Sequence, residues 1–152
     1  MHPFMKQISV TYRCGMRYRE RELADTGLAG IHTPYLTTLY RHPGISQEEL
    51  ARKLHVNKSS VTRQLGVLEQ NGYVSREPSR EDKRAVLVYP TEKALAIRER
   101  IREVLQGWNA YLTADMTQEE RETLAQLMER VAQRAEDYVN GGEAACDSLE
   151  HM

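Results

Sequence analysis

The chain has few of the features that indicate a secreted or membrane-bound protein. Only two of its 152 residues are cysteines, Cys14 and Cys146, which are too few and too far apart for a disulfide framework or a paired-cysteine metal site. No apolar run approaches the roughly 20 residues that a membrane-spanning helix needs, and the first residues lack the apolar stretch of a signal peptide. We therefore expect a cytoplasmic protein with reduced thiols and no membrane association.

The chain also lacks the short motifs of common enzymes. It contains no phosphate-binding Walker loop and no GxGxxG, GxSxG or HExxH pattern. Its five histidines are scattered along the chain without the spacing of metal ligands. We therefore expect neither an enzyme nor a metal or cofactor site.

Net charge is close to zero, but it is unevenly distributed. The formal value is −1, yet residues 41–89 carry nine basic and six acidic side chains, whereas residues 113–152 carry three basic and ten acidic ones. An acidic segment thus masks a basic middle of the chain. Such an asymmetry would orient the approach of a polyanion toward the basic segment.

Apolar residues recur every three or four positions over most of the chain, which predicts a mainly helical protein. Two segments match the capping-box pattern, Ser46 to Glu49 and Thr117 to Glu120, and Asn57 can cap a further helix. The expected helices cover residues 4–24, the segment from just after Pro34 to His42, and residues 46–55, 57–71, 91–112 and 117–139.

Between residues 73 and 89 the pattern changes from helical to extended. Two predicted strands, 73–77 and 85–89, flank a polar turn at 78–83, which is typical of a β-hairpin with a charged tip. The two short helices before this hairpin, joined by a tight turn, have helix-turn-helix spacing. The sequence therefore predicts a mainly α (α+β) fold with a winged helix-turn-helix lobe.

The second helix of this pair carries side chains suited to DNA. Burial of Val61, Leu65 and Leu68 on one stripe leaves hydroxyls and long donors on the other side, and such groups fit the base edges of the major groove. A solvated helix face is the alternative interpretation. The candidate DNA-binding residues at this helix are Asn57, Lys58, Ser59, Ser60, Thr62, Arg63 and Gln64.

The hairpin tip adds a second basic element directly downstream. Arg80, Lys83 and Arg84 cluster there, and basic side chains on such a wing follow phosphates or enter the minor groove. Asp82 could pair with the Arg84 guanidinium and hold it in one orientation. Helix and wing together predict contact with DNA.

Several segments resemble the MarR family of transcriptional regulators in order and spacing. The similarity spans about residues 30–95, and in two places the chain departs from the family pattern, with Pro90 and Ala94 where leucine and glycine are usual. The matching segments are Gln47-Glu48-Glu49-Leu50-Ala51, Val56-Asn57-Lys58-Ser59-Ser60-Val61-Thr62, residues 68–76, Asp82-Lys83-Arg84-Ala85-Val86-Leu87-Val88 and Thr91-Glu92-Lys93.

This resemblance implies a homodimer that binds a pseudopalindromic double-stranded operator. Residues 1–140 would form one domain, with a DNA-binding lobe at about 30–90 and dimerisation helices at 1–26 and 91–140, followed by a flexible tail at 141–152. Arg84 would be the minor-groove arginine and Asp82 its orienting partner, and Gln47 would join the DNA-binding residues. The family also implies a repressor that is released by a small-molecule effector.

Three further hypotheses concern regulation and alternatives. A small aromatic effector would need a pocket, for which the candidate lining residues are Tyr12, His32, Tyr35, Tyr40, Trp108 and Tyr111. Cys14 has arginines nearby that would favour a thiolate, so a redox-sensing regulator is an alternative to a structural thiol. A winged helix that binds protein rather than DNA is another alternative, which the basic wing argues against.

Overall fold

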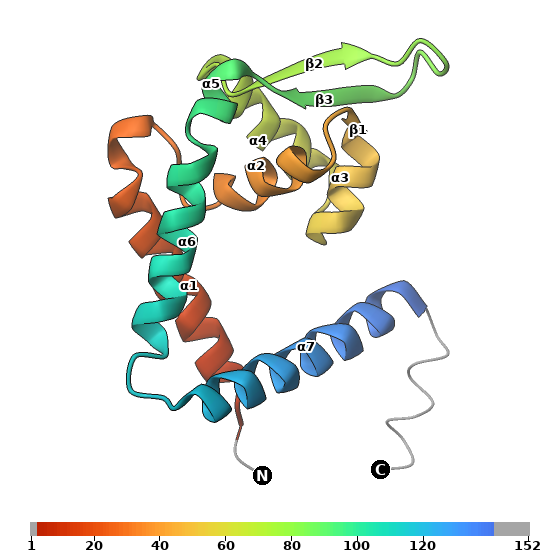
Figure 1. Ribbon diagram of the computed structural model, residues 1–152. Coiled ribbons are helices and arrows are strands. Elements are labelled where there is room, and N and C mark those ends of the chain that lie inside the picture. The colour runs from red at the N-terminus through yellow and green to blue at the C-terminus, as the bar shows by residue number, and fades with distance from the viewer. Residues whose placement is uncertain (1–2, 142–152) are drawn as a thin grey trace. The chain divides into compact units, whose positions relative to one another are not determined.

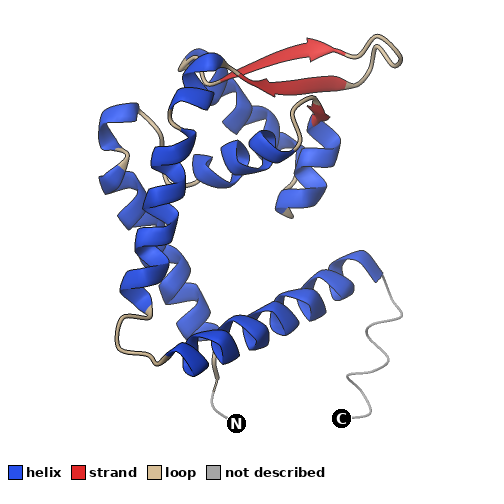
Figure 2. Cartoon of the chain, viewed as in Figure 1, coloured by secondary structure: helices blue, strands red, loops and turns tan. Residues whose placement is uncertain are grey.

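The computed structural model describes residues 3–141 and divides the chain into two compact units, residues 1–109 and 110–152, which are described separately. Helices dominate, and all the strands belong to one small sheet (Figure 2). The elements in chain order (Figure 1) are α1 (Met5–Glu22), the 3₁₀ helix η1 (Ala24–Thr26), α2 (His32–Arg41), β1 (Ile45–Ser46), α3 (Gln47–Leu54), α4 (Lys58–Gln70), β2 (Val74–Pro78), β3 (Val86–Pro90), α5 (Glu92–Ala96), α6 (Arg98–Leu112) and α7 (Gln118–Gly141).

Helices α3 and α4 form the predicted helix-turn-helix. The Ser46 hydroxyl accepts a hydrogen bond from the Glu49 amide at 3.1 Å, and Asn57 Oδ1 accepts one from the Ser60 amide at 2.8 Å. His55 lies between the helices in the left-handed region, with φ of 53°. His55 thus ends α3 and Asn57 begins α4 within three residues, as the sequence predicts. The Glu49 carboxylate contacts Arg52.

The sheet is antiparallel, with strand order β1-β3-β2. The hairpin of β2 and β3 is the predicted one, and it pairs Arg76 with Val88. Strand β1 has only two residues and was not predicted, because no periodic pattern can be recognised in so short a segment. Its pairing of Ile45 with Val88 joins the start of α3 to the base of the wing.

The core of the first unit lies between the helix-turn-helix, α2 and the sheet. Val61, Leu65 and Leu68 of α4 are fully buried, so this helix has a single inward face, as predicted. Burying one such side chain stabilises a fold by about 1.5–3 kcal/mol. Other fully buried or nearly buried members of the core are Leu23, Leu28, Tyr35, Leu36, Leu39, Leu50, Tyr73, Val74, Val88, Ala94 and Ile101.

The prediction of one continuous helix over residues 91–112 is wrong, because the structure has two helices, α5 and α6, that meet at Ile97. In an uninterrupted α-helix the Ala94 carbonyl would accept a hydrogen bond from the amide four residues later. Here it accepts from the Tyr40 hydroxyl at 2.6 Å and from the Ile97 amide at 3.3 Å. Burial raises the pKa of Tyr40 to about 12, which keeps its hydroxyl a donor.

Helix α2 begins at His32, slightly earlier than predicted, with Pro34 inside its first turn. Proline is tolerated there because the first amides of a helix have no partner within it. The Pro34 carbonyl accepts hydrogen bonds from the hydroxyls of Thr37 and Thr38.

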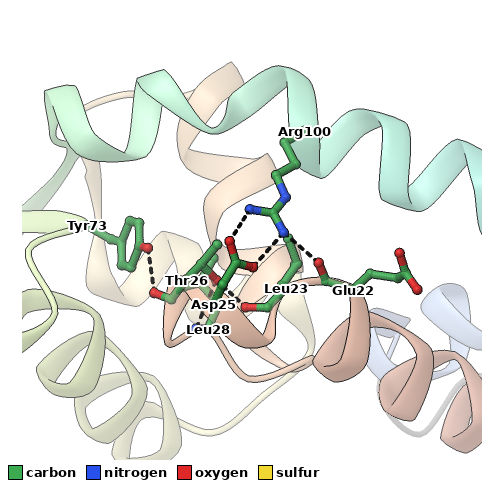
Figure 3. Close-up of polar contacts among 7 residues, drawn as sticks. All are labelled: Glu22, Leu23, Asp25, Thr26, Leu28, Tyr73 and Arg100. Atoms are coloured by element: carbon green, nitrogen blue, oxygen red, sulfur yellow. Dashed lines mark hydrogen bonds and ion pairs between the residues drawn. The ribbon is translucent and has the colours of Figure 1, made fainter.

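The connection from α1 to α2 is anchored to α6 and to the residue before β2 (Figure 3). Arg100 of α6 donates to both carboxylate oxygens of Asp25, at 2.8 and 2.6 Å, and to the Glu22 carbonyl at 2.8 Å. The Tyr73 hydroxyl donates to the Thr26 carbonyl at 2.6 Å. The Arg100 hydrogen bonds hold the pKa of Asp25 below its usual value. This connection therefore links α1 to both α6 and the winged lobe.

Helices α1 and α6 pack through two reciprocal glycine contacts. The Trp108 ring lies against Gly15 and the Tyr18 hydroxyl lies against Gly107, where an added Cβ would meet these side chains at 2.9 and 3.0 Å. The two rings also stack on each other, with centroids 5.0 Å apart. Each glycine thus makes room for the aromatic side chain of the opposite helix.

In the second unit, helix α7 begins at a complete capping box. Thr117 Oγ1 accepts from the Glu120 amide at 3.2 Å, and Glu120 Oε2 accepts from the Thr117 amide at 2.8 Å. None of the residues of α7 is buried. Its predicted apolar stripe includes the exposed side chains of Leu124, Leu127, Met128 and Tyr138.

No helix in the described part of the chain is long and apolar enough to cross a membrane. The predicted tail at 141–152 lies, apart from its first residue, outside the described residues.

Candidate nucleic-acid interface

The outward face of α4 carries most of the predicted DNA-binding side chains. Asn57, Lys58, Ser59, Thr62 and Arg63 are exposed, on the side of the helix away from its buried leucines. Ser60 is partly buried beside them. Exposed hydroxyls, a lysine and an arginine are therefore presented together on the first two turns of one helix, and the helix dipole favours an anion at its amino end.

Several of these side chains are held in place by local contacts. Lys58 Nζ lies 3.2 Å from Glu48 Oε1 on α3, and the Ser59 hydroxyl donates to Asn57 Oδ1 at 2.8 Å. The Thr62 hydroxyl donates to the Lys58 carbonyl at 2.9 Å. The amino end of α4 thus presents an ordered set of polar groups.

The loop between β2 and β3 forms the tip of the wing and projects beyond the strands (Figure 1). Arg80, Lys83 and Arg84 are all exposed on or beside it. The Ser79 hydroxyl accepts hydrogen bonds from the amides of Glu81 and Asp82, which closes the turn. The wing is therefore a structured basic finger.

Asp82 does not make the ion pair predicted for it. Its Oδ1 accepts a hydrogen bond from the main-chain amide of Arg84 at 3.0 Å, and the structure of residues 3–141 includes no contact between Asp82 and the Arg84 guanidinium. Because Asp82 accepts from the backbone, it shapes the turn, and the Arg84 side chain is exposed beside it.

A groove with a volume of about 260 Å³ separates the wing from the helix-turn-helix. Four of the predicted DNA-binding residues meet in it, Gln47, Lys58, Thr62 and Arg84. Two of these are cations, Lys58 from α4 and Arg84 from the wing, and Glu48 pairs with Lys58. The full lining is Ser46, Gln47, Glu48, Lys58, Thr62, Arg84, Ala85 and Val86. The other predicted DNA-binding residues lie outside this lining.

Arg76, which no sequence pattern singled out, bridges three elements of this surface. From β2 its guanidinium contacts Glu69 on α4 at 3.1 Å and Gln47 on α3 at 3.3 Å. These partners are 7 and 29 residues away in sequence. No local pattern indicates such contacts, which arise only when the strand packs beside both helices.

Gln64 is directed toward α2 and contacts His32, which was predicted to line a ligand pocket. His32 is buried, and its Nδ1 accepts a hydrogen bond from the Ala29 amide at 3.0 Å. The other ring nitrogen, Nε2, must then carry the proton and donate to Gln64 Oε1, 3.0 Å away. Neutral His32 therefore connects the start of α2 to the middle of α4.

Burial lowers the pKa of His32 below 6.5, and the hydrogen bond to Gln64 opposes this shift. Below pH 6.5 the unfolded chain therefore takes up a proton that the native His32 side chain resists. As the pH is lowered, we expect the free energy of unfolding to decrease by up to about 1.4 kcal/mol per pH unit. Urea unfolding between about pH 7.5 and 5 would measure this slope, which His32→Gln should flatten.

The exposed His42, replaced by glutamine, provides the matched control for that experiment. The carboxylates with lowered pKa, such as Asp25 and Glu69, lose their stabilising effect only below their usual pKa, as the pH falls through the lowered one. Equal slopes in the wild type and the His32 variant would contradict the assignment.

The aromatic residues predicted to line an effector pocket have diverse surroundings. Tyr35 is buried in the core, Tyr40 bonds to Ala94, and Trp108 stacks on Tyr18. Tyr12 of α1 is exposed, and so is Tyr111 in the second unit. Cys14 is a free, exposed thiol on α1. Among residues 3–141, no group of histidine, cysteine, aspartate or glutamate could hold a metal ion.

Comparison with known proteins gives a consistent result. The model of the MarR family matches residues 32–86, which include the helix-turn-helix and most of the hairpin. The uncharacterized HTH-type transcriptional regulator YybA of Bacillus subtilis (strain 168) is 28% identical over 145 residues, which make up 93% of this chain and 97% of that protein.

Solved structures agree over nearly the whole chain. A crystal structure of MarR is 30% identical with a TM-score of 0.81, covering 88% of this chain and 98% of that one. A MarR variant from E. coli complexed with operator DNA is 28% identical with a TM-score of 0.77, covering 85% and 93%. The chain therefore belongs to the MarR family of helix-turn-helix transcriptional regulators.

Proposed function

We propose that the protein is a cytoplasmic, homodimeric repressor that places α4 in the major groove of each operator half-site and the wing in the adjacent minor groove. The groove between wing and helix-turn-helix carries this proposal, because Lys58 of α4 and Arg84 of the wing both line it. A DNA backbone that passes between α4 and the wing would meet both cations. A MarR variant from E. coli has been solved in complex with operator DNA, which supports operator binding by this fold.

On α4 the side chains fit distinct tasks. Lys58, Ser59 and Asn57 lie at the amino end, where contacts to phosphate are favoured. Thr62 and Arg63 are exposed farther along the helix, where an arginine suits guanine and a threonine methyl suits thymine. Ser60 and Gln64 are partly buried and would support these residues, and Gln64 does so through its bond to His32.

On the wing, three exposed cations would contact the phosphates and the minor groove: Arg80, Lys83 and Arg84. Asp82 would act through the backbone, since it fixes the turn from which Arg84 extends. Gln47, which also lines the groove, would complete the interface.

A second copy of the chain would cover the apolar stripe of α7. Leu124, Leu127, Met128 and Tyr138 are all exposed there, and a row of large apolar side chains on one helix marks an interaction surface. Helix α1 carries exposed apolar side chains of its own, including Met5 and Tyr12. A two-fold dimer would impose its symmetry on the operator and separate the two half-sites by about 34–36 Å.

We include in this proposal that a small aromatic effector releases the DNA. Such a ligand would act by favouring placements of the winged lobe that no longer match the half-site spacing, which is a shift of population. The exposed Tyr12 is available for a direct contact. Contact with Tyr40 or Trp108 would require their packing to change, since both are engaged within the fold.

Selection of bound duplexes from a random DNA pool would test the proposal. We expect a pseudopalindromic consensus, with an affinity that falls steeply as salt rises because counterions are released. Recovery of only salt-sensitive background would contradict sequence-specific binding and favour a winged helix that binds protein. Recovery of an isolated half-site bound by one chain would contradict the homodimer.

A further inference from the structure

We infer that Arg76 is a positioning residue for base recognition, which acts through Gln47 to fix the hydrogen-bonding state of Thr62 on α4. The inference rests on the proposed function, because it assigns a role within the proposed interface. Arg76 lies on β2, and its side chain is only 23% exposed. A guanidinium so far withdrawn from solvent is suited to contacts within the protein.

The carboxylate of Glu69 holds the guanidinium in one orientation. Arg76 Nη2 donates to Glu69 Oε1 at 3.1 Å, and Nε donates to Oε2 at 3.3 Å, so the contact is two-pronged. This geometry is specific to arginine, because a lysine offers a single nitrogen. The same contact lowers the pKa of Glu69, which keeps the carboxylate ionised near neutral pH.

The remaining arm of the guanidinium fixes the amide of Gln47. Nη1 of Arg76 donates to Gln47 Oε1 at 3.3 Å. Turning the amide over would place its NH₂ group against another donor, so Arg76 permits only one orientation. In that orientation Gln47 Nε2 faces Thr62 and donates to its Oγ1 at 3.3 Å.

The hydroxyl of Thr62 is thereby engaged as both an acceptor and a donor within the protein. It accepts from Gln47 and gives its own proton to the Lys58 carbonyl, 2.9 Å away. What remains for DNA is the methyl group and one acceptor lone pair. The thymine methyl and the amino groups of adenine or cytosine match this surface, whereas the acceptors N7 and O6 of guanine do not.

Arg76→Lys tests the inference, because it keeps the charge and removes the fork. We expect the variant to lose about fivefold or more of the wild-type preference at the base pair that faces Thr62, with an unchanged salt dependence. Gln47→Ala should relax the same position, and the double variant should do no more than either single variant, since all act through one relay.

The rotamer of the Thr62 side chain provides a second test, which needs no DNA. In the free protein, NMR coupling constants of Thr62 should report one side-chain rotamer in the wild type and averaging in Arg76→Lys and Gln47→Ala. Arg102→Lys is the matched control, because it alters an arginine–glutamate pair on α6 outside the helix-turn-helix. Circular dichroism would establish that each variant is folded.

The outcomes separate the alternatives. An Arg76→Lys protein that keeps both the wild-type base preference and a single Thr62 rotamer overturns the inference. So does a uniform loss of affinity for all sequences, which would make Arg76 a phosphate contact. If the wild type itself shows no base preference, the proposed function fails, and the rotamer measurement still decides whether Arg76 holds Thr62.

Discussion

Arg84→Ala is expected to weaken binding to the selected operator by about tenfold or more, within the range of 1–3 kcal/mol for a specific arginine contact. Arg84 lines the groove beside α4, and Asp82 Oδ1 accepts a hydrogen bond from its main-chain amide. The head group is therefore positioned to extend into DNA. Fluorescence anisotropy at two salt concentrations would measure the affinity and a decrease of about one in the salt slope.

Arg102→Ala provides the control for this experiment, since it removes an exposed arginine from α6 without altering the wing. Arg84→Lys separates charge from shape, and should retain the salt slope while losing part of the affinity. An Arg84→Ala protein with wild-type affinity and salt slope would remove the wing from the proposed interface.

Gly30→Ala is expected to cause the largest loss of stability among alanine substitutions of the glycines within residues 3–141. A Cβ at Gly30 would lie 2.5 Å from the Met16 carbonyl oxygen and 3.2 Å from two further backbone atoms of that residue. Relief would require α1 to shift as a whole. We expect a loss of about 3 kcal/mol, the upper end of the range for overpacked sites.

Urea unfolding of Gly30→Ala and Gly66→Ala would test this expectation, because the first variant should be less stable than the wild type and the second more stable. A Cβ at Gly66, inside α4, would meet only the tip of Arg76 at 3.9 Å, an ordinary contact. Alanine there should stabilise the helix by about 0.5–1 kcal/mol, since glycine is the weaker helix former. Similar stabilities for the two variants would show that α1 yields easily at Gly30.

Local signals allowed much of the fold to be predicted. The caps at Ser46, Asn57 and Thr117 each lie within three residues of the amides they satisfy, so their chemistry is visible in the sequence. The break at Ile97 could not be predicted, because it accompanies a hydrogen bond from Tyr40, 54 residues from its acceptor. Long-range contacts of this kind override helical periodicity.

In the candidate site, too, residues marked by local signals could be predicted, and residues that depend on long-range contacts could not. Exposed polar residues on α4 followed from the spacing of its buried residues, and the basic wing followed from its turn. The relay from Arg76 through Gln47 to Thr62 did not, since it joins a strand to two helices. Aromatic residues such as Tyr35 and Trp108 were expected near a ligand, but spacing alone cannot distinguish a pocket lining from a packed core.

The packing of α1 on α6 also gives the protein an optical signal of its own. Trp108 is the single tryptophan of the chain, so its fluorescence arises from one place, the contact with Gly15 and the Tyr18 ring. Any event that separates these two helices would change the polarity around the indole, and with it the wavelength and intensity of emission. The junction can thus be followed in real time without an attached dye.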